Sequence, residues 1–466
     1  MGGFFGVVSQ EDCIYDLYFG IDYHSHLGTS RGGIAVNQGN KINRIIHNIE
    51  NTQFRSKFDG DLPKLHGTSG IASISDMEQQ PLTIFSNLGY YAITTVGRIN
   101  NIENLTRHIF ETRDAHFVEM FNGEINQTEL VAAIINSEKD FVSGINKVYE
   151  LIDGSISILI LTDNKIIAAR DKHGRTPIFI GKKTNNVCAT MESCALSNLG
   201  YTKYHELGSG EIVTFNHEEL IVLQKPNNTK KICAFFWVYY GYPSSEYEGE
   251  NVENVRYRCG QALVKNDNIK PDVVAGFPDS GTAHAIGYAN EAKIPFTRPF
   301  VKYTPTWTRS FMPQNQELRN LVARMKIMPV KELIKNKKLL FCEDSIVRGT
   351  QIRETVDLLI SDGADEVHVR SASPPIMYGC KYLNFSRSTS DMDLIARKEI
   401  FEIEGSVPKN LDEYLDNTSD KYKKMIEGIR KKLNLTSLSY QSLDDLLNAI
   451  GIDKNNICTY CWNGKS

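Results

Sequence analysis

The sequence predicts an α+β domain, followed by an α/β domain with a mainly parallel sheet and a helical C-terminal tail. Short strand-like runs separated by Gly, Asn and Asp dominate the first part of the chain, up to about Leu223. From Ala234 to about Ser373, helix-period segments alternate with apolar strands, which is typical of βαβ units. After Met392 the pattern is mostly helical.

In the first part, paired strands surround two helices, which indicates a layered α+β domain. The helices are expected at residues 101–112 and 127–136. The strands are expected at residues 6–9, 33–36, 91–95, 156–161, 166–169 and 211–215. The polar stretch 224–231 is the expected linker to the second part.

In the second part, strands and helices alternate regularly. Helices are expected at residues 252–264, 283–292 and 351–362, and strands at residues 272–277, 338–342 and 366–370. Sheets of this kind bind ligands at the carboxyl ends of their strands. In the tail, residues 411–433 and 442–449 are expected to be helical.

Composition and charge exclude several classes of partner. The formal net charge of −4 gives no reason to expect a nucleic acid or an anionic membrane. The most apolar run, residues 156–161, is far too short to span a bilayer. The start of the chain lacks the basic and apolar regions of a signal peptide, and its nine cysteines are an odd count. A cytoplasmic protein without a disulfide framework is therefore expected.

The strongest chemical signal is the run LLFCEDSIVRGTQ, residues 339–351. A buried strand is followed by the acids Glu343 and Asp344, then by a tight loop that ends in Gly349 where a helix begins. Amide groups before a helix N-terminus attract a phosphate. The two carboxylates can receive ribose hydroxyls and help to hold Mg²⁺. Such a loop suits a phosphorylated sugar, although an acid pair alone would also fit an ordinary capped turn.

This run resembles the phosphoribosylpyrophosphate (PRPP) signature of type I phosphoribosyltransferases, in the form found in glutamine PRPP amidotransferases. The usual form has two aspartates, and here the first is Glu343. Other segments match the same family in order: 276–281, 285–296, 302–311, 324–326 and 373–375. Thr306 stands where a tyrosine is usual. The match covers nearly the whole chain.

The resemblance implies three regions. They are an N-terminal-nucleophile (Ntn) glutaminase-like domain at residues 1–225, a phosphoribosyltransferase domain at 226–400, and a helical tail with cluster cysteines at 401–466. It implies that ammonia displaces pyrophosphate from PRPP, with Mg²⁺ near Glu343 and Asp344 and with closure of a loop over the substrate. The implied catalytic residues are Lys302, Arg309, Glu343 and Asp344. The implied PRPP-binding residues are Asp279, Ser280, Gly281, Lys326, Ser345, Val347, Arg348, Gly349 and Thr350.

Four cysteines form a second constellation. Cys458 and Cys461 are a Cys-x-x-Cys pair, which can bind zinc, bind an iron–sulfur cluster or do redox work. The family resemblance nominates Cys233 and Cys380 as their partners. It implies a structural [4Fe–4S] cluster that fastens the tail to the core. A structural Zn²⁺ and free thiols remain the alternatives.

The glutaminase half departs from its family. Gly2 stands where the resemblance places the nucleophilic cysteine, and glycine has no nucleophile. The residue that would clamp the glutamine carboxylate falls at Ser73, and the one that would hold its amine falls at Gln127. Val96 and Gly97 stand where the oxyanion hole has Asn-Gly, and Arg98 follows in place of an asparagine. The fold is expected to survive while glutamine hydrolysis is lost.

Processing could in principle expose another nucleophile, Cys13. The family motif has glycine after the cysteine, and here Ile14 follows. Because residues 2–6 already fill the motif, this rescue is not favoured.

Three functions remain open. The favoured one is an amidophosphoribosyltransferase of purine biosynthesis that uses free ammonia or ammonia from a separate glutaminase chain. The others are a non-catalytic PRPP or nucleotide sensor that regulates an active paralogue, and a phosphoribosyltransferase with another acceptor. The family implies a homo-oligomer that purine nucleotides can inhibit.

Overall fold

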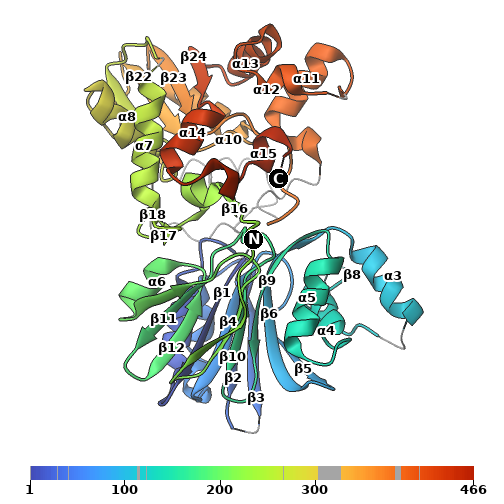
Figure 1. Ribbon diagram of the computed structural model, residues 1–466. Helices are drawn as coiled ribbons and strands as arrows, with labels where there is room; N and C mark the ends of the chain where they lie inside the picture. The colour runs from blue at the N-terminus through green and yellow to red at the C-terminus, as the bar shows by residue number, and fades with distance from the viewer. Residues whose placement is uncertain are drawn as a thin grey trace.

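The computed structural model describes residues 2–28, 30–39, 41–112, 116–121, 123–265, 267–302, 327–383, 390–408 and 410–465. It has two lobes (Figure 1). The lower lobe is a sandwich of two sheets, and the upper lobe is a smaller sheet surrounded by helices (Figure 1). Within the described part of the chain, no helix is both long enough and apolar enough to cross a membrane.

The first sheet of the sandwich is antiparallel and has seven strands. Its centre is β1, which pairs with β12 on one side and β4 on the other. In spatial order the strands are β13 (Thr202–Glu206), β11 (Phe179–Lys183), β12 (Asn186–Thr190), β1 (Gly2–Ser9), β4 (Ser69–Ser75), β2 (Arg31–Asn37) and β3 (Ile42–Asn48).

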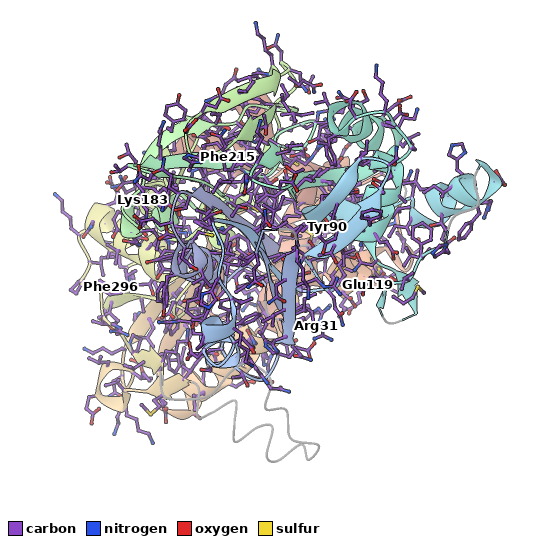
Figure 2. All side chains as sticks on the ribbon, turned by 90° about the horizontal axis from the view of Figure 1, so that it is seen from below. Arg31, Tyr90, Glu119, Lys183, Phe215 and Phe296 are labelled. Atoms are coloured by element: carbon purple, nitrogen blue, oxygen red, sulfur yellow. The ribbon has the colours of Figure 1, made fainter. Side chains whose placement is uncertain are left out.

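The second sheet is also antiparallel and has six strands. In spatial order they are β15 (Leu220–Gln224), β14 (Ile212–Phe215), β10 (Ile166–Ala169), β9 (Gly154–Leu161), β6 (Gly89–Ile99) and β5 (Leu82–Ser86). Figure 2 labels Arg31 and Lys183 on the first sheet and Tyr90 and Phe215 on the second. Strands β1 and β9 are almost entirely buried because each is covered on both faces, which suits sequences made mostly of apolar residues, glycine and serine.

Helices cover the outer faces of the sandwich. Helix α1 contacts β1, β2 and β4, and α4 contacts β5 and β6. The start of α4 is capped by Asn126 and that of α5 by Asp140. The small elements of this lobe are α1 (Ile14–Asp22), α2 (Phe54–Phe58), η1 (Leu62–Lys64), α3 (Ile102–Thr112), β7 (Met120–Phe121), β8 (Glu124–Ile125), α4 (Gln127–Ile135), α5 (Phe141–Leu151) and α6 (Ser193–Asn198).

The upper lobe is built on a parallel sheet in the order β19 (Val273–Gly276), β22 (Lys338–Glu343), β23 (Glu366–Ser371) and β24 (Ser437–Tyr440). This confirms the predicted alternation of strands and helices. Its main helices are α7 (Val252–Val264), α8 (Thr282–Ala292), α10 (Thr350–Ser361), α11 (Ile395–Glu404), α13 (Asp420–Lys432) and α14 (Leu443–Ile450). Two antiparallel strand pairs are added, β17 (Glu246–Tyr247) with β18 (Glu250–Asn251), and β20 (Phe300–Lys302) with β21 (Ile327–Pro329). The remaining short helices are η2 (Phe236–Tyr240), η3 (Lys331–Leu333), η4 (Asp391–Asp393), α12 (Asp412–Leu415), η5 (Lys454–Asn456) and α15 (Tyr460–Asn463).

The tail differs from the expectation in two ways. The single helix expected at 411–433 is broken into α12 and α13, because the hydroxyl of Ser419 accepts the amide of Tyr422 and starts a new helix there. The tail also supplies β24, which pairs with β23. The tail is therefore part of the parallel sheet as well as a set of helices.

Contacts between distant segments join the two lobes. The buried carboxylate of Glu192 in the lower lobe accepts hydrogen bonds from Ser245 and Tyr247 in the upper lobe. Strand β16 (Ile232–Cys233), just after the linker, pairs in parallel with β25 (Ile457–Cys458) near the C-terminus. Figure 1 shows that both chain ends lie near this junction.

Candidate active site

A buried acidic pair lies at the carboxyl edge of the parallel sheet. Glu343 ends β22 and is 8% exposed, and Asp344 follows it and is 5% exposed. Ser280 Oγ donates to Glu343 Oε1 over 2.9 Å, and the amide of Asp344 donates to the same oxygen over 3.1 Å. Ser345 Oγ donates to Asp344 Oδ2 over 2.6 Å. These partners are neutral, so a divalent cation would compensate the two carboxylates.

The surroundings of Glu343 in the folded chain favour the protonated form of its carboxyl group more than solvent does. Burial, and then the adjacent charge of Asp344, raise the pKa of Glu343 well above its usual value. Two neighbouring carboxylates in one buried site cannot both ionise cheaply. A cation that binds here would therefore displace a proton as well as water.

A second loop reaches the same edge from the neighbouring strand. After β19, the amide of Phe277 donates to the carbonyl of Cys342 over 3.1 Å, which brings residues 277–281 against the end of β22. The peptide bond between Pro278 and Asp279 is cis. Lys302, at the end of β20, donates to Asp279 Oδ2 over 2.8 Å, and both side chains are more than half exposed. An exposed pair of this kind is readily exchanged for a ligand contact.

The loop that follows the acidic pair ends at a glycine which the geometry requires. Gly349 has a φ of 76° and caps the start of α10. A Cβ there would lie 2.7 Å from Ile395 Cδ1 and 2.8 Å from Leu433 Cδ2. The carbonyl of Val347 accepts the amide of Ile395, which holds the loop on α11. Free amides at the start of α10 thus face the same edge as the acidic pair, which suits a phosphate.

The structure brings most of the predicted sugar-phosphate residues to this edge. Arg348 is exposed and donates to Asp393 over 3.4 Å, so it lies on the outer side of the loop. Arg309, Lys326 and the expected closing loop lie outside the described residues. The predicted residues at the edge are Asp279, Ser280, Gly281, Lys302, Glu343, Asp344, Ser345, Val347, Gly349 and Thr350.

The lower lobe contains a much smaller cavity beside the start of β1. Its volume is about 30 Å³, which is room for one or two water molecules. The lining residues are Gly2, Ile74, Ser75, Met77, Glu78, Gln80, Thr95, Val96, Gly97, Gln127 and Ile156.

Glu78 lines this cavity, and its carboxylate is held in place by hydrogen bonds. It is 6% exposed and accepts the amide of Gln127 over 2.7 Å and the amide of Thr128 over 3.1 Å. The hydroxyl of Thr128 also donates to it over 2.8 Å. Burial raises the pKa of Glu78, while these hydrogen bonds oppose that shift. The start of α4 is thus satisfied by a carboxylate from the chain itself.

Known proteins resemble this chain over its whole length. Residues 70–198 match a family model described as a glutamine amidotransferase domain. An amidophosphoribosyltransferase of Pyrococcus horikoshii is 30% identical over 423 residues, which are 89% of this chain and 91% of that protein. An amidophosphoribosyltransferase of Synechocystis is 28% identical over 474 residues, covering 99% of this chain and 90% of that protein. The chain belongs to the amidophosphoribosyltransferase family.

Solved structures of the family support the fold assignment. The glutamine PRPP amidotransferase of B. subtilis, complexed with ADP and GMP, superposes with a TM-score of 0.84 at 28% identity. The alignment covers 99% of this chain and 96% of that one. The predicted fold class is therefore confirmed. An Ntn-type amidotransferase domain is followed by a phosphoribosyltransferase domain, as in the solved relative.

Four of the five predicted glutaminase positions meet at the small cavity of the Ntn-type domain. Gly2, Val96, Gly97 and Gln127 line it, whereas Ser73 does not. Ser73 lies buried within β4, opposite Phe4 of β1. Glu78 was not predicted from the sequence, although an acid a few residues after the expected clamp position Ser73 was a signal for it.

Cys13 is a poor candidate for a replacement nucleophile. It is 1% exposed and precedes α1. Burial, and then the charges of Asp12 and Asp16, raise the pKa of its thiol to about 12. A buried thiol of this kind stays protonated and unreactive at neutral pH.

The four predicted cluster cysteines come together at the lobe junction. Cys233 and Cys458 are register partners on β16 and β25. Cys461 lies within hydrogen-bonding reach of the Cys380 thiol, and its carbonyl accepts the amides of Met377 and Tyr378. That thiol contact, and then burial, raise the pKa of Cys461 well above its usual value. Burial, and then the neighbouring Cys458 and Cys380, likewise raise the pKa of the Cys233 thiol well above its usual value.

The donor set fits a soft metal group. Four neighbouring thiols, of which three are buried and that of Cys461 is partly exposed, are ligands for zinc or for an iron–sulfur cluster. Among the described residues, no three His, Cys, Asp or Glu side chains are already arranged to hold a metal ion. The buried side chain of Arg175, close to Cys458, has Nε and Nη1 atoms without a hydrogen-bond partner in the described part of the chain. An anionic group among the thiols would satisfy these donors.

Glu343→Gln is expected to stabilise the metal-free chain, and to do so more strongly as the pH rises. A carboxyl whose folded pKa is raised binds a proton on folding. Its contribution is complete below its unfolded pKa, about 4.3, and is lost as the pH rises through the folded pKa. Gln removes this titration and keeps an acceptor for Ser280. Thermal unfolding midpoints in EDTA between about pH 5 and pH 8 measure the divergence.

The matched control for this prediction is Glu354→Gln, an exposed change in α10. Its midpoints should follow those of the unchanged protein across the same pH range. A Glu343→Gln chain that also follows them, without divergence at the higher pH, would contradict the assigned environment of Glu343.

Proposed function

We propose that this protein transfers ammonia to PRPP, giving 5-phosphoribosylamine and pyrophosphate, and that it does not hydrolyse glutamine. The observation that carries the proposal is the buried pair Glu343 and Asp344 beside the loop of Ser280, at one edge of the sheet. Family membership supports the reaction class, and the family acts in purine biosynthesis. The small volume of the cavity at Gly2, about 30 Å³, supports the loss of the glutaminase.

The residues at this edge can divide the work of the reaction. The amides at the start of α10 would hold the sugar's phosphate. The hydroxyl of Ser345 lies in the preceding loop, and that of Thr350 lies on the first residue of the helix. Glu343 and Asp344 would hold the ribose hydroxyls and Mg²⁺, which supplies positive charge to the leaving pyrophosphate. Lys302 would exchange Asp279 for the pyrophosphate oxygens. Ammonia forms the bond to the anomeric carbon as the bond to pyrophosphate breaks, and the new ammonium group gives up a proton.

We further propose that the four cysteines at the lobe junction hold a [4Fe–4S] cluster. Cys233 follows the linker, Cys380 follows β23, and Cys458 and Cys461 lie near the C-terminus. A group that binds all four would fasten the tail to both lobes. A structural Zn²⁺ would use the same donors, and metal analysis together with acid-labile sulfide separates the two.

Partners follow from the same proposal. A chain without its own glutaminase needs free ammonia or a separate glutaminase chain. Inhibition by purine nucleotides is supported by the B. subtilis relative, which was solved with ADP and GMP bound. A homo-oligomer is expected from the family.

The deciding experiment is a pyrophosphate-release assay with PRPP and Mg²⁺. Ammonium should support release, whereas glutamine should give no more than the assay without a nitrogen source, because Gly2 offers no nucleophile. If PRPP binds measurably but neither ammonium nor glutamine supports pyrophosphate release, the sensor would be favoured over the enzyme. Glutamine-dependent release would overturn the proposed loss of the glutaminase.

A further inference from the structure

Arg175 belongs to the Ntn-type domain but lies among the cysteines of the other lobe. It sits in the segment between β10 and β11 and is 3% exposed. Its amide donates to Asp171 Oδ2 over 2.5 Å, and its carbonyl accepts the amide of Cys233 over 3.1 Å. The backbone at this position is therefore tied to the strand that carries the first cysteine.

The guanidinium group of Arg175 is directed at the thiols. Its central carbon lies 3.7 Å from the centre of the Tyr382 ring, which fixes the plane of the group. The side chain is within hydrogen-bonding reach of the Cys458 thiol, and its charge also acts on Cys233. Nε and Nη1 have no partner among the described residues.

This arrangement is costly unless an anion completes it. A buried cation with unpaired N–H groups loses hydration that nothing replaces, and this destabilises the folded chain. Neutral thiols are weak acceptors. An iron–sulfur cluster held by four thiolates is anionic, and hydrogen bonds to its sulfurs are among the factors that set its reduction potential.

A second arginine of the same domain holds the loop that carries another cysteine. Arg98 Nη1 donates to the carbonyl of Cys380 over 3.0 Å, and Asn100 Nδ2 donates to the carbonyl of Lys381 over 2.9 Å. Arg98 directly follows Val96 and Gly97, the altered oxyanion-hole positions. The strand that would serve glutamine hydrolysis in the family thus ends here in a contact with the cysteine loop.

We infer that Arg175 contacts the cysteine-bound cluster through its free Nε and Nη1 donors and stabilises the cluster's negative charge. It is a positioning residue for the cofactor, supplied by the degenerate glutaminase-like domain. The inference rests on the proposed [4Fe–4S] cluster. It gives that domain a role which survives the loss of its own chemistry.

The test begins with iron and acid-labile sulfide in the purified, anaerobically prepared protein. Arg175→Met removes the charge and the donors while keeping an apolar stem against Tyr382. We expect iron loss to a chelator to become about tenfold faster, in line with the effect of losing an outer-shell partner. The cluster's reduction potential should shift to a more negative value, because the reduced cluster loses a nearby cation. Arg175→Lys should restore part of both properties.

Lys172→Met is the matched control, because it removes the same charge from an exposed position of the same segment. It should leave both chelation rate and potential unchanged. If Arg175→Met does not fold, pulsed EPR of the reduced, unmutated protein containing ¹⁵N-arginine gives the same answer. An arginine nitrogen coupling supports the contact, and its absence overturns it.

Two failures can be told apart. A purified protein without iron and sulfide would overturn the proposed cluster and this inference with it. A protein with a full cluster, whose chelation rate and potential are the same in Arg175→Met, would overturn the inference alone. Neither result depends on pyrophosphate release.

Discussion

Asp344→Asn should lower ammonia-dependent pyrophosphate release about a hundredfold or more. The side chain is buried beside Glu343 at the edge where the sugar phosphate is proposed to bind. Asn keeps the size and an acceptor for Ser345 but removes the charge that would hold Mg²⁺ and balance the developing cation on the sugar. The loss should appear in kcat/KM for PRPP, measured with ammonium at saturation.

The matched control is Asp365→Asn, an exposed change in the same lobe. It should leave release within twofold of the unchanged protein, since exposed sites away from the chemistry contribute little. Calorimetric titration of each protein with PRPP, in the presence of Mg²⁺, measures substrate binding and completes the test. If Asp344→Asn released pyrophosphate at the normal rate, the acidic pair would not be the reactive edge and the proposed reaction site would be wrong.

The parallel sheet was predictable because its strands and helices have strong local patterns. The buried run that became β22, its acids and Gly349 are contiguous, so the phosphate loop could be identified from the sequence alone. Helix α7 was predicted with the same bounds, and β10 likewise. Where local pattern and tertiary environment agree, sequence reasoning succeeds.

Other elements could not be predicted because distant contacts determine them. Strand β24 has only four residues between two helices and is stabilised by pairing with β23, about seventy residues away along the chain. Helix α5 was missed, although Asp140 caps its start. The break between α12 and α13 depends on one capping serine. Short elements like these take their conformation from neighbours rather than from their own periodicity.

The candidate sites show the same division. The four cysteines were assigned through the family resemblance, and the structure places them together. Arg175 was not predicted, because its contact with Cys458 joins segments from the two lobes that are far apart in the sequence. Glu78 likewise reaches Gln127 across about fifty residues of chain. Side chains that complete a site from another segment leave no local signature.

The two lobes therefore differ in how their buried acidic side chains are satisfied. The upper lobe keeps a buried acidic pair, which is unfavourable in the absence of a ligand and is typical of a functional site. In the lower lobe, the cavity at Gly2 has room for only one or two water molecules, and Glu78, which lines it, is hydrogen-bonded to Gln127 and Thr128. A buried polar network with its partners satisfied stabilises the fold. The lower lobe still supplies Arg98 and Arg175 to the junction.

Restoring the nucleophile with Gly2→Cys should not restore glutamine hydrolysis, and should destabilise the protein by about 1–3 kcal/mol. A Cβ on Gly2 would lie 2.3 Å from the carbonyl oxygen of Ile74, which is backbone and cannot move aside cheaply. The adjoining cavity of about 30 Å³ has no room for glutamine. Glu78 holds the start of α4, so the space would not open without breaking its hydrogen bonds with Gln127 and Thr128.

Gly60→Cys provides the matched control, because Gly60 is exposed and a Cβ there would meet nothing within 4 Å. Its unfolding midpoint in urea should stay close to that of the unchanged chain, whereas the midpoint of Gly2→Cys should fall. Glutamate release from glutamine should be absent in both. A Gly2→Cys chain that is fully stable and releases glutamate would mean that the glutaminase site lacks only its thiol. The small cavity and the hydrogen bonds of Glu78 imply instead that the backbone around Gly2 and the carboxylate of Glu78 would both have to change before a nucleophile there could act.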